Sequence, residues 1–236
     1  MFKSRKQYFR NLIVTLALVL GLVMPTSTHP AQAQGNPNPG VIPNNTQYRT
    51  LSAKWWQWVI SIPAATNPLL DATGANCAQG QSGPVWFLAG STGDTVTRTC
   101  TVPIGKQLFF PLLNIIFGSG VFDCDPTNPG VPCDVDTLRA GAAGAMDNLL
   151  LLEARVDGRE LQNLSAYRAQ SPVFSITVPP DPIFGLPLTG TFTPQVSDGY
   201  WLMLAPLPPG NHTIHFKATA SFGFTVEVTY NLTITP

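Results

Sequence analysis

Four aspartates around two cysteines form the densest group of side chains that could do chemistry. Two of them flank Cys124 and two follow Cys133; they are Asp123, Asp125, Asp134 and Asp136. A disulfide between these cysteines would gather the carboxylates, which repel one another unless a cation neutralises them. Since hard oxygen ligands suit Ca²⁺, one hypothesis is a calcium site, although the spacing is not that of an EF-hand. The alternative is a solvated acidic loop in which Asp134 or Asp136 caps the following helix.

Three tryptophans within four residues form a second group with functional potential. On a helix, Trp55 and Trp58 share one face with Ile62, while Trp56 projects elsewhere. One interpretation is that large side chains anchor a short helix onto a sheet. The other is an aromatic platform that binds a sugar ring or another flat ligand, with Trp56 the most exposed of the three.

Residues for acid–base or nucleophilic catalysis are few, and the sequence assigns none of them. Of three histidines, His212 and His215 lie three apart on a predicted strand and so point to opposite faces. The Gly-x-Ser-x-Gly elbow and the zinc-protease helix motif are both missing from the sequence. A hydrolase that uses two carboxylates stays open. A concave cleft with paired carboxylates would favour that enzyme, and a flat aromatic strip would favour a binding protein.

The four cysteines predict disulfide bonds. An even number in an exported chain is typical of a disulfide framework, and four cysteines allow three connectivities. We favour the pairs that are local in sequence, Cys77–Cys100 and Cys124–Cys133. A metal site of cysteines is disfavoured because the sequence has no Cys-x-x-Cys motif.

Residues 1–33 have the three regions of a cleavable signal peptide. A basic region with Lys3 and Arg10 is followed by the apolar run 12–23 and by Ala31-Gln32-Ala33, which predicts cleavage after Ala33. The apolar run is about half of the roughly 20 residues that span a bilayer. The alternative is a short N-terminal membrane anchor. We expect a secreted or periplasmic protein without a transmembrane segment after cleavage.

Cleavage would change the charge of the chain. Four of the 13 basic side chains and none of the 13 acidic ones lie before the predicted cut, which leaves a mildly acidic protein. Binding to phosphates needs a basic field, so nucleic acid is not an expected partner. Residues 34–49 are rich in Pro, Asn and Gly and predict a flexible linker.

Two helices are predicted, and they would flank a sheet. The first begins at Thr50 or Ser52 and ends at Ser61, before Pro63. The second begins after Asp134 or Thr137 and runs for about four turns. Between them, the apolar run 108–117 contains Pro111, which predicts an edge strand or a bend. The same run contains Asn114, which we interpret as a structural bracket because a buried amide must find hydrogen-bond partners.

The remaining elements are predicted strands. They are residues 84–89, 96–102, 153–156, 173–178, 189–196, 200–205, 212–218 and 224–235. The strand 200–205 is apolar on both faces and should be central, covered by the tryptophan helix. The pattern predicts a mainly β protein, an antiparallel β-sandwich of the immunoglobulin-like or jelly-roll-like kind with two short flanking helices. It would be one domain over 50–236, or two that divide near Tyr167.

Several segments resemble a group of secreted bacterial proteins of uncharacterised function. They are AKWWQWVISIP, GPVWFLAG, CTVPIGKQLFFPLLN and YWLMLAPLPPGNHTIHF, and the resemblance extends from about Leu51 onward. It implies a bacterial source and export, and it brings no activity. We therefore expect an exported, non-enzymatic binding or surface-interaction protein; the sequence does not identify its ligand, for which a carbohydrate or another envelope component is a candidate. The alternatives are a hydrolase or lyase acting on extracellular polymers and a calcium-stabilised structural matrix protein.

Overall fold

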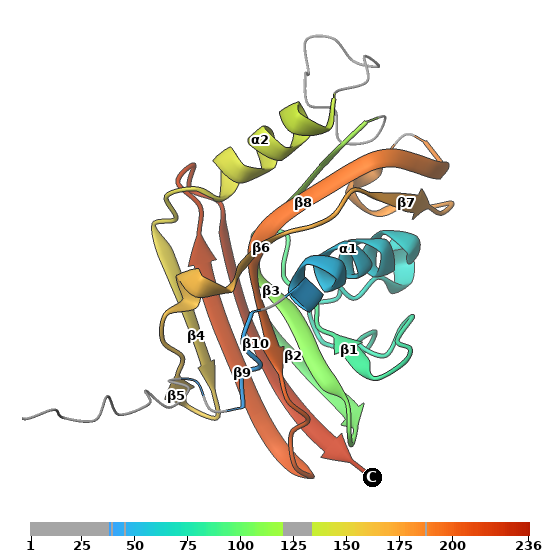
Figure 1. Cartoon of the computed structure of the whole chain (residues 1–236). Coiled ribbons are helices and arrows are strands. Elements are labelled where there is room, and N and C mark those ends of the chain that lie inside the picture. Colours follow the sequence, from blue (N-terminus) through green and yellow to red (C-terminus); the bar gives the residue numbers. More distant parts are fainter. Residues whose placement is uncertain (1–37, 39, 45, 120–133, 187) are drawn as a thin grey trace, which may run out of the picture. The chain divides into compact units, whose positions relative to one another are not determined.

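The structure, a computed structural model, describes residues 38, 40–44, 46–119, 134–186 and 188–236 (Figure 1). They belong to one compact unit, Asn36–Pro236, which is not divided near Tyr167. The predicted signal peptide and the predicted pair Cys124–Cys133 lie outside the described residues and stay predictions. Within the described part of the chain, no helix combines the length and the apolar character needed to cross a membrane.

The prediction of a mainly β protein is confirmed, and the strands form two sheets. The first has the order β1-β3-β8-β6, with β7 also paired to β8. Its strands are β1 (Val85–Phe87), β3 (Gln107–Gly118), β6 (Arg168–Gln170), β7 (Phe174–Val178) and β8 (Gly190–Leu204). The second has the order β2-β10-β9-β4-β5. Its strands are β2 (Thr95–Pro103), β4 (Leu151–Val156), β5 (Arg159–Glu160), β9 (Gly210–Thr219) and β10 (Thr225–Thr235).

The prediction that the sheets are purely antiparallel is wrong. β1 runs parallel to β3, and β2 runs parallel to β10 along the length of both strands. β10 turns back antiparallel to β9, as the hairpin pattern predicts, and its other edge accepts β2 from far away in the sequence. Alternation of apolar residues predicts which face of a strand is buried, but it does not predict the direction of a distant partner.

Two α-helices flank the first sheet, as predicted, although their bounds differ. α1 spans Thr46–Ser61, so it begins before Thr50. Val41 is buried and bridges to Leu204 of β8, so residues 40–44 and 46–49 are part of the compact unit instead of the predicted linker. α2 spans Val135–Met146 and ends earlier than four turns predict, because the chain soon enters β4. Short 3₁₀ turns occur at Ala64–Thr66, Leu164–Tyr167 and Ile183–Gly185.

The first sheet is covered on both faces, and this explains why residues 108–113 of β3 and 200–204 of β8 are apolar throughout. Phe110 of β3 stacks on Phe216 of β9, with ring centroids 5.3 Å apart, and this contact joins the two sheets. On the opposite face, Phe109 stacks on Trp201 at 5.2 Å, and Trp201 meets Trp55 of α1 edge to face at 5.7 Å. The predicted cover of the central strand by the tryptophan helix is confirmed. In Figure 1, β8 passes between α1 and α2.

Candidate functional site: an apolar pocket beside strand β3

A cavity of about 480 Å³ lies where α1, β3 and the turn between β9 and β10 meet. Its volume is within the range of small-molecule sites, roughly 300–1,000 Å³. The described side chains around it are almost all apolar, and none is ionisable. They are Trp55, Trp56, Leu69, Gly90, Ser91, Thr92, Pro111, Leu112, Leu113, Asn114, Ile115, Ile116, Met146, Phe184, Phe222, Phe224 and Val226.

Two of the three predicted ligand-binding tryptophans line this cavity, but from the interior of the protein. Trp55 and Trp56 are 1% and 6% exposed and meet edge to face at 5.1 Å. The expectation that Trp56 is exposed is wrong, because from Thr50 onward the exposed side of α1 consists of Thr50, Lys54, Gln57 and Ser61. Trp55 Nε1 donates to the carbonyl of Leu88, and Trp58 Nε1 donates to that of Gln79. Trp58 is also buried and is not among the lining residues.

Strand β3 supplies the longest stretch of the wall, because it loses a neighbour there. β1 pairs with β3 only as far as Phe109, whereas the pairing with β8 continues to Gly118. From Pro111 onward, β3 has a paired strand on one side only among the described residues, and its register shifts between Pro111 and Leu113. The prediction of an edge strand or a bend at Pro111 is therefore confirmed. The cavity lies along this edge.

Asn114 is in the same stretch, and its side chain lacks the partners that the sequence led us to expect. Its Nδ2 is buried without a hydrogen-bond partner, so the interpretation of Asn114 as a structural bracket is wrong. The residue opposite it on β8 is Gly199. A Cβ at Gly199 would lie 2.6 Å from the Cβ of Asn114, so only glycine lets β8 approach this closely. The close packing fixes the backbone of Asn114 in the wall of the cavity.

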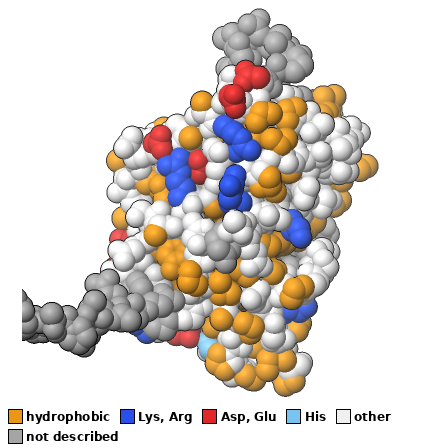
Figure 2. Space-filling model, in the orientation of Figure 1, with side chains coloured by type: hydrophobic (Ala, Val, Ile, Leu, Met, Phe, Trp, Pro, Cys, Tyr) orange, Lys and Arg blue, Asp and Glu red, His pale blue; other side chains and the backbone are white. Residues whose placement is uncertain are grey.

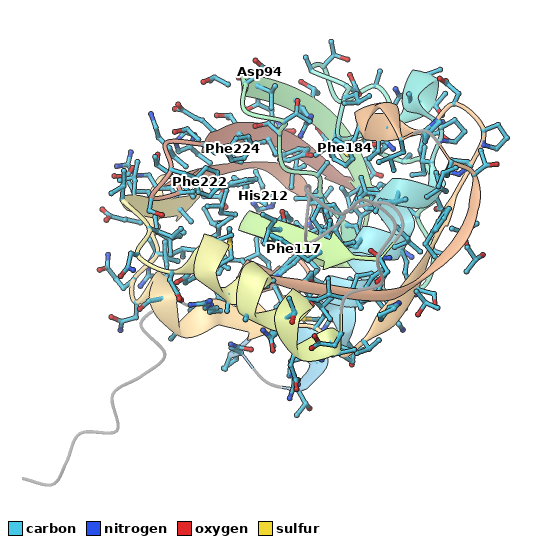
Figure 3. All side chains as sticks on the ribbon, turned by 90° about the horizontal axis from the view of Figure 1, so that it is seen from above. Asp94, Phe117, Phe184, His212, Phe222 and Phe224 are labelled. Atoms are coloured by element: carbon cyan, nitrogen blue, oxygen red, sulfur yellow. A yellow bond between two sulfur atoms is a disulfide. The ribbon has the colours of Figure 1, made fainter. Side chains whose placement is uncertain are left out.

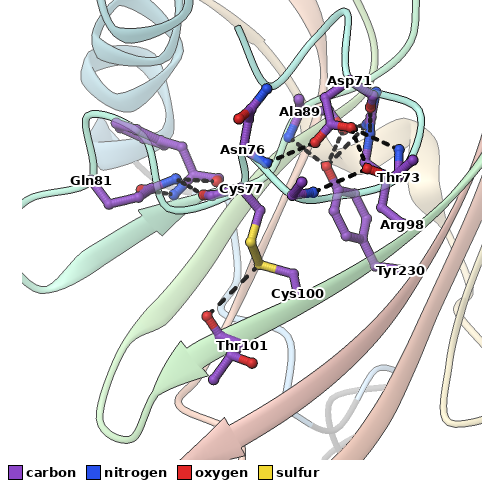
Figure 4. Close-up of a disulfide and its surroundings, with 12 residues drawn as sticks. Asp71, Thr73, Asn76, Cys77, Gln81, Ala89, Arg98, Cys100, Thr101 and Tyr230 are labelled. Atoms are coloured by element: carbon purple, nitrogen blue, oxygen red, sulfur yellow. Dashed lines mark hydrogen bonds between the residues drawn. A yellow bond between two sulfur atoms is a disulfide. The ribbon is translucent and has the colours of Figure 1, made fainter. Parts of the chain in front are cut away.

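A buried arginine holds the loop after β1, which contributes Gly90, Ser91 and Thr92 to the wall. Figure 4 shows this arginine, Arg98, with Ala89 and Tyr230. Arg98 of β2 is 1% exposed, and its guanidinium donates hydrogen bonds only to uncharged oxygens. The acceptors are the carbonyls of Leu69, Asp71, Ala89 and Gly90 and the hydroxyl of Tyr230, at 2.6–3.2 Å. These bonds tie two loops to the second sheet.

Tyr230 and a disulfide complete this support. Burial raises the pKa of Tyr230, so its hydroxyl stays protonated and donates to the carbonyl of Ala89 while it accepts from Arg98. The predicted disulfide Cys77–Cys100 is confirmed, and it joins the loop before β1 to β2. Arg98 and Cys100 occupy alternate inward positions on β2, so one strand carries both attachments.

Three phenylalanines at the cavity are exposed. Phe184 is 45% exposed, Phe222 63% and Phe224 37%. Phe222 and Phe224 stack at 6.4 Å in the turn between β9 and β10 (Figure 3). The ring of Phe224 lies against Gly93, where any Cβ would come within 3.2 Å of it. The sequence reasoning did not single out Phe222 or Phe184. Large apolar residues next to Gly223 and Gly185, in turns, were the signal that could have found them.

The chemistry available to the lining residues is recognition of an uncharged ligand. Ser91, Thr92 and Asn114 are the polar side chains besides the indoles, and a serine nucleophile needs an adjacent base that the described lining does not provide. Trp56 Nε1, Ser91 Oγ and Asn114 Nδ2 are all buried without partners. They are three of the eight buried, unpaired polar side-chain atoms among the described residues, and because buried polar groups nearly always have partners, this wall is a candidate site.

The predicted calcium ligands are only partly within the described residues. Asp123 and Asp125 lie outside them, and calcium binding stays a prediction. Asp134 is the N-cap of α2: its carboxylate accepts from Thr137 N at 2.9 Å and from Thr137 Oγ1 at 2.7 Å. These two bonds lower the pKa of Asp134. Asp136 is in the first turn of the helix. In the described part of the chain, no three His, Cys, Asp or Glu side chains gather as a metal site would require.

Basic side chains are spaced among uncharged and acidic ones on the face shown in Figure 2. Among the described residues, several basic side chains make contacts within the fold. Arg168 pairs with Asp198 and Asp147 and donates to the carbonyl of Ala143, which ties β6 to β8 and α2. The hydrogen bond to Asp198 raises the pKa of Arg168 although burial opposes the shift. Arg139 donates to the carbonyl of Ser171.

Comparison of the chain with models of known families, with curated proteins and with solved structures finds no match. The resemblance to secreted bacterial proteins therefore stays a prediction. The function proposed below follows from the geometry of the pocket.

Proposed function

We propose that this chain is an exported binding protein that holds a small, uncharged and mainly apolar molecule in the pocket beside β3. The observation that carries the proposal is the cavity of about 480 Å³ with an almost wholly apolar lining that includes Trp55 and Trp56. Apolar pockets with a few polar groups are the usual form of small-molecule sites. Exposed Phe184, Phe222 and Phe224 would offer such a molecule a first apolar contact.

Export is part of the proposal. It is supported by the predicted signal peptide and by the disulfide Cys77–Cys100, since disulfides persist in oxidising compartments. We also propose that the two sheets are the layers of a β-sandwich, which the stack of Phe110 on Phe216 supports. Whether this is immunoglobulin-like or jelly-roll-like belongs to the same prediction.

A surface platform for carbohydrate is not supported, because Trp55, Trp56 and Trp58 are at most 6% exposed. Nor does the described lining contain the paired carboxylates that a polymer-degrading hydrolase would need. Displacement of a bound probe by oligosaccharides would favour the carbohydrate alternative.

The test is titration of the protein, purified without residues 1–33, with the neutral fluorescent probe N-phenylnaphthylamine. We expect saturable binding of one probe per chain, with quenching of tryptophan emission because two indoles line the pocket. Soluble oligosaccharides added to the loaded protein should displace nothing. No saturable binding of the probe up to its solubility limit would refute the proposed function.

Two glycine variants locate the probe. A Cβ at Gly90 would make ordinary contacts, 3.7 Å from Pro111 and 4.0 Å from Val226, so Gly90→Leu should fill the pocket without a clash at Cβ. Gly144 on α2 has open space around it, so Gly144→Leu is the matched control. We expect Gly90→Leu to weaken probe binding about tenfold or more and Gly144→Leu to leave it unchanged. Equal affinities of the two variants would place the probe elsewhere.

A further inference from the structure

Given the proposed function, we infer the chemical class of the ligand: a neutral molecule with a carbonyl or hydroxyl oxygen on an apolar skeleton, bound through Asn114 and Ser91. These two residues belong to the pocket wall, and each has a polar atom that is buried without a partner. They come from different elements, β3 and the loop that Arg98 holds. A ligand in the pocket lies against both.

Asn114 is the stronger part of the inference. An amide NH₂ carries two donors, and no hydrogen bond of this side chain occurs in the described structure. The neighbouring residues of β3 are apolar, and a leucine would fit the pattern of the strand better. A polar side chain in such a place, without a structural partner, is explained if it is used by a ligand.

Ser91 provides a second group in the wall of the same cavity. Its hydroxyl is buried and unpaired, and the preceding residue is fixed because Gly90 O accepts from Arg98 at 2.7 Å. The backbone is thus held while the hydroxyl can rotate. Both polar atoms are turned into the wall in this structure. Rotation about χ1 of Ser91 and about the broad χ2 of Asn114 would bring them to a ligand.

The donors determine what the ligand must offer. The Asn114 NH₂ can only donate a hydrogen bond, and the Ser91 hydroxyl can also donate one. A ligand that pairs with both groups must therefore offer an acceptor oxygen. No cationic side chain is among the described lining residues, so a carboxylate would lose its hydration without a compensating charge. We therefore expect ketones, esters or alcohols to bind better than hydrocarbons of the same shape, and carboxylates to bind worst.

The experiment compares three competitors of N-phenylnaphthylamine: the hydrocarbon hexylbenzene, the ketone hexanophenone and the carboxylate anion 6-phenylhexanoate. The first two share one carbon skeleton and differ by a carbonyl. For the wild type we expect the ketone to bind about tenfold more tightly than the hydrocarbon, the ratio that one net hydrogen bond provides. We expect the carboxylate to be the weakest competitor. A ratio of one between ketone and hydrocarbon would overturn the inference.

Variants assign the effect to the two residues. Asn114→Leu and Ser91→Ala should each reduce the ratio of ketone to hydrocarbon affinity while keeping the affinity for hexylbenzene. Asn114→Leu should also raise the melting temperature of the free protein, because it removes a buried amide without partners. Ser197→Ala is the matched control for Ser91→Ala: its hydroxyl is likewise buried and unpaired but is not in the pocket wall. It should leave the ratio unchanged.

The outcomes separate the two proposals. If both substitutions leave the ratio unchanged while the probe still binds, the assignment of Asn114 and Ser91 is wrong and the proposed function stands. If the wild type binds none of the three compounds and no probe, the proposed function itself fails. Ser91→Ala removes a single oxygen, so it keeps the test decisive even if Asn114→Leu does not fold.

Discussion

Replacing Arg98 with methionine is expected to destabilise the protein by about 3–5 kcal/mol, because it leaves several buried carbonyls without hydrogen-bond donors. The guanidinium donates to four carbonyls and one phenol hydroxyl and is 1% exposed. A buried acceptor left without a donor costs about 1–3 kcal/mol, so four carbonyls without donors would cost about 4–12 kcal/mol in total. Local relaxation and the removal of a buried charge offset part of that cost.

The assay is urea denaturation followed by tryptophan fluorescence, with thermal unfolding as a second measurement. A loss of 3–5 kcal/mol in a domain of this size lowers the melting temperature by roughly 6–20 °C. Arg98→Lys should fall between the wild type and Arg98→Met, because an ammonium keeps the charge but reaches fewer carbonyls. Probe affinity should fall with both variants, because Arg98 holds Gly90 beside the pocket.

The exposed Arg155 on β4 provides the matched control. Arg155→Met makes the same change in a solvated position and should alter stability by no more than about 0.5 kcal/mol. A loss below about 1 kcal/mol for Arg98→Met would refute the reasoning, since it would mean that the carbonyls find other donors at little cost.

Three further predictions concern single contacts. Reduction of Cys77–Cys100, or the double variant Cys77→Ala/Cys100→Ala, should lower stability by about 3 kcal/mol in the chain-entropy model, measured by denaturation with and without reductant. His212 pairs with Asp157 at 2.8 Å, and this bond raises the pKa of His212 although burial opposes the shift. The contribution is present below about pH 6.5 and is lost as pH rises through the raised pKa, so His212→Gln should cost more at about pH 5.5 than at about pH 8.5. The difference should stay under about 1 kcal/mol because the carboxylate is half exposed, and an equal cost at both pH values would contradict it. Asp134→Ala should lower the melting temperature at neutral pH, while Asp134→Asn keeps the helix cap and should not. Because the pKa of Asp134 is lowered, the Asp134→Ala effect should become smaller in acid, where the protonated carboxyl keeps a neutral acceptor as asparagine does but loses its charge, and an effect independent of pH would contradict a contribution of that charge.

Much of the fold could be predicted from local pattern. The strict alternation of residues 224–235 predicts β10, and its buried positions are the apolar ones. Asp157-Gly158 predicts the turn between β4 and β5, where Asp157 adopts a positive φ of 50°. Pro111 predicts the edge of β3 for a chemical reason, the missing N–H. Each of these features, a strand, a turn and a strand edge, depends on residues that are close together in the sequence.

The long strand β8 is a feature that local sequence pattern did not predict correctly. The sequence predicts two strands, 189–196 and 200–205, and the structure has one strand, Gly190–Leu204. Ser197, Asp198 and Gly199 appear as a break, yet each pairs with β3. Gly199 is required there by the close approach of Asn114, a contact between residues far apart in the chain.

The features of the candidate site also fall into those that the sequence predicts and those that depend on tertiary packing. The sequence by itself determined that a helix with three tryptophans would pack on a central strand, that Asp134 could cap a helix and that Cys77 could pair with Cys100. Only the tertiary structure decided that Trp56 lines an apolar cavity, that Asn114 Nδ2 has no partner and that a charged side chain, Arg98, is buried among carbonyls. The physical reason is that periodicity specifies the face on which a residue lies, whereas a cavity and its unpaired polar groups depend on how distant elements pack together.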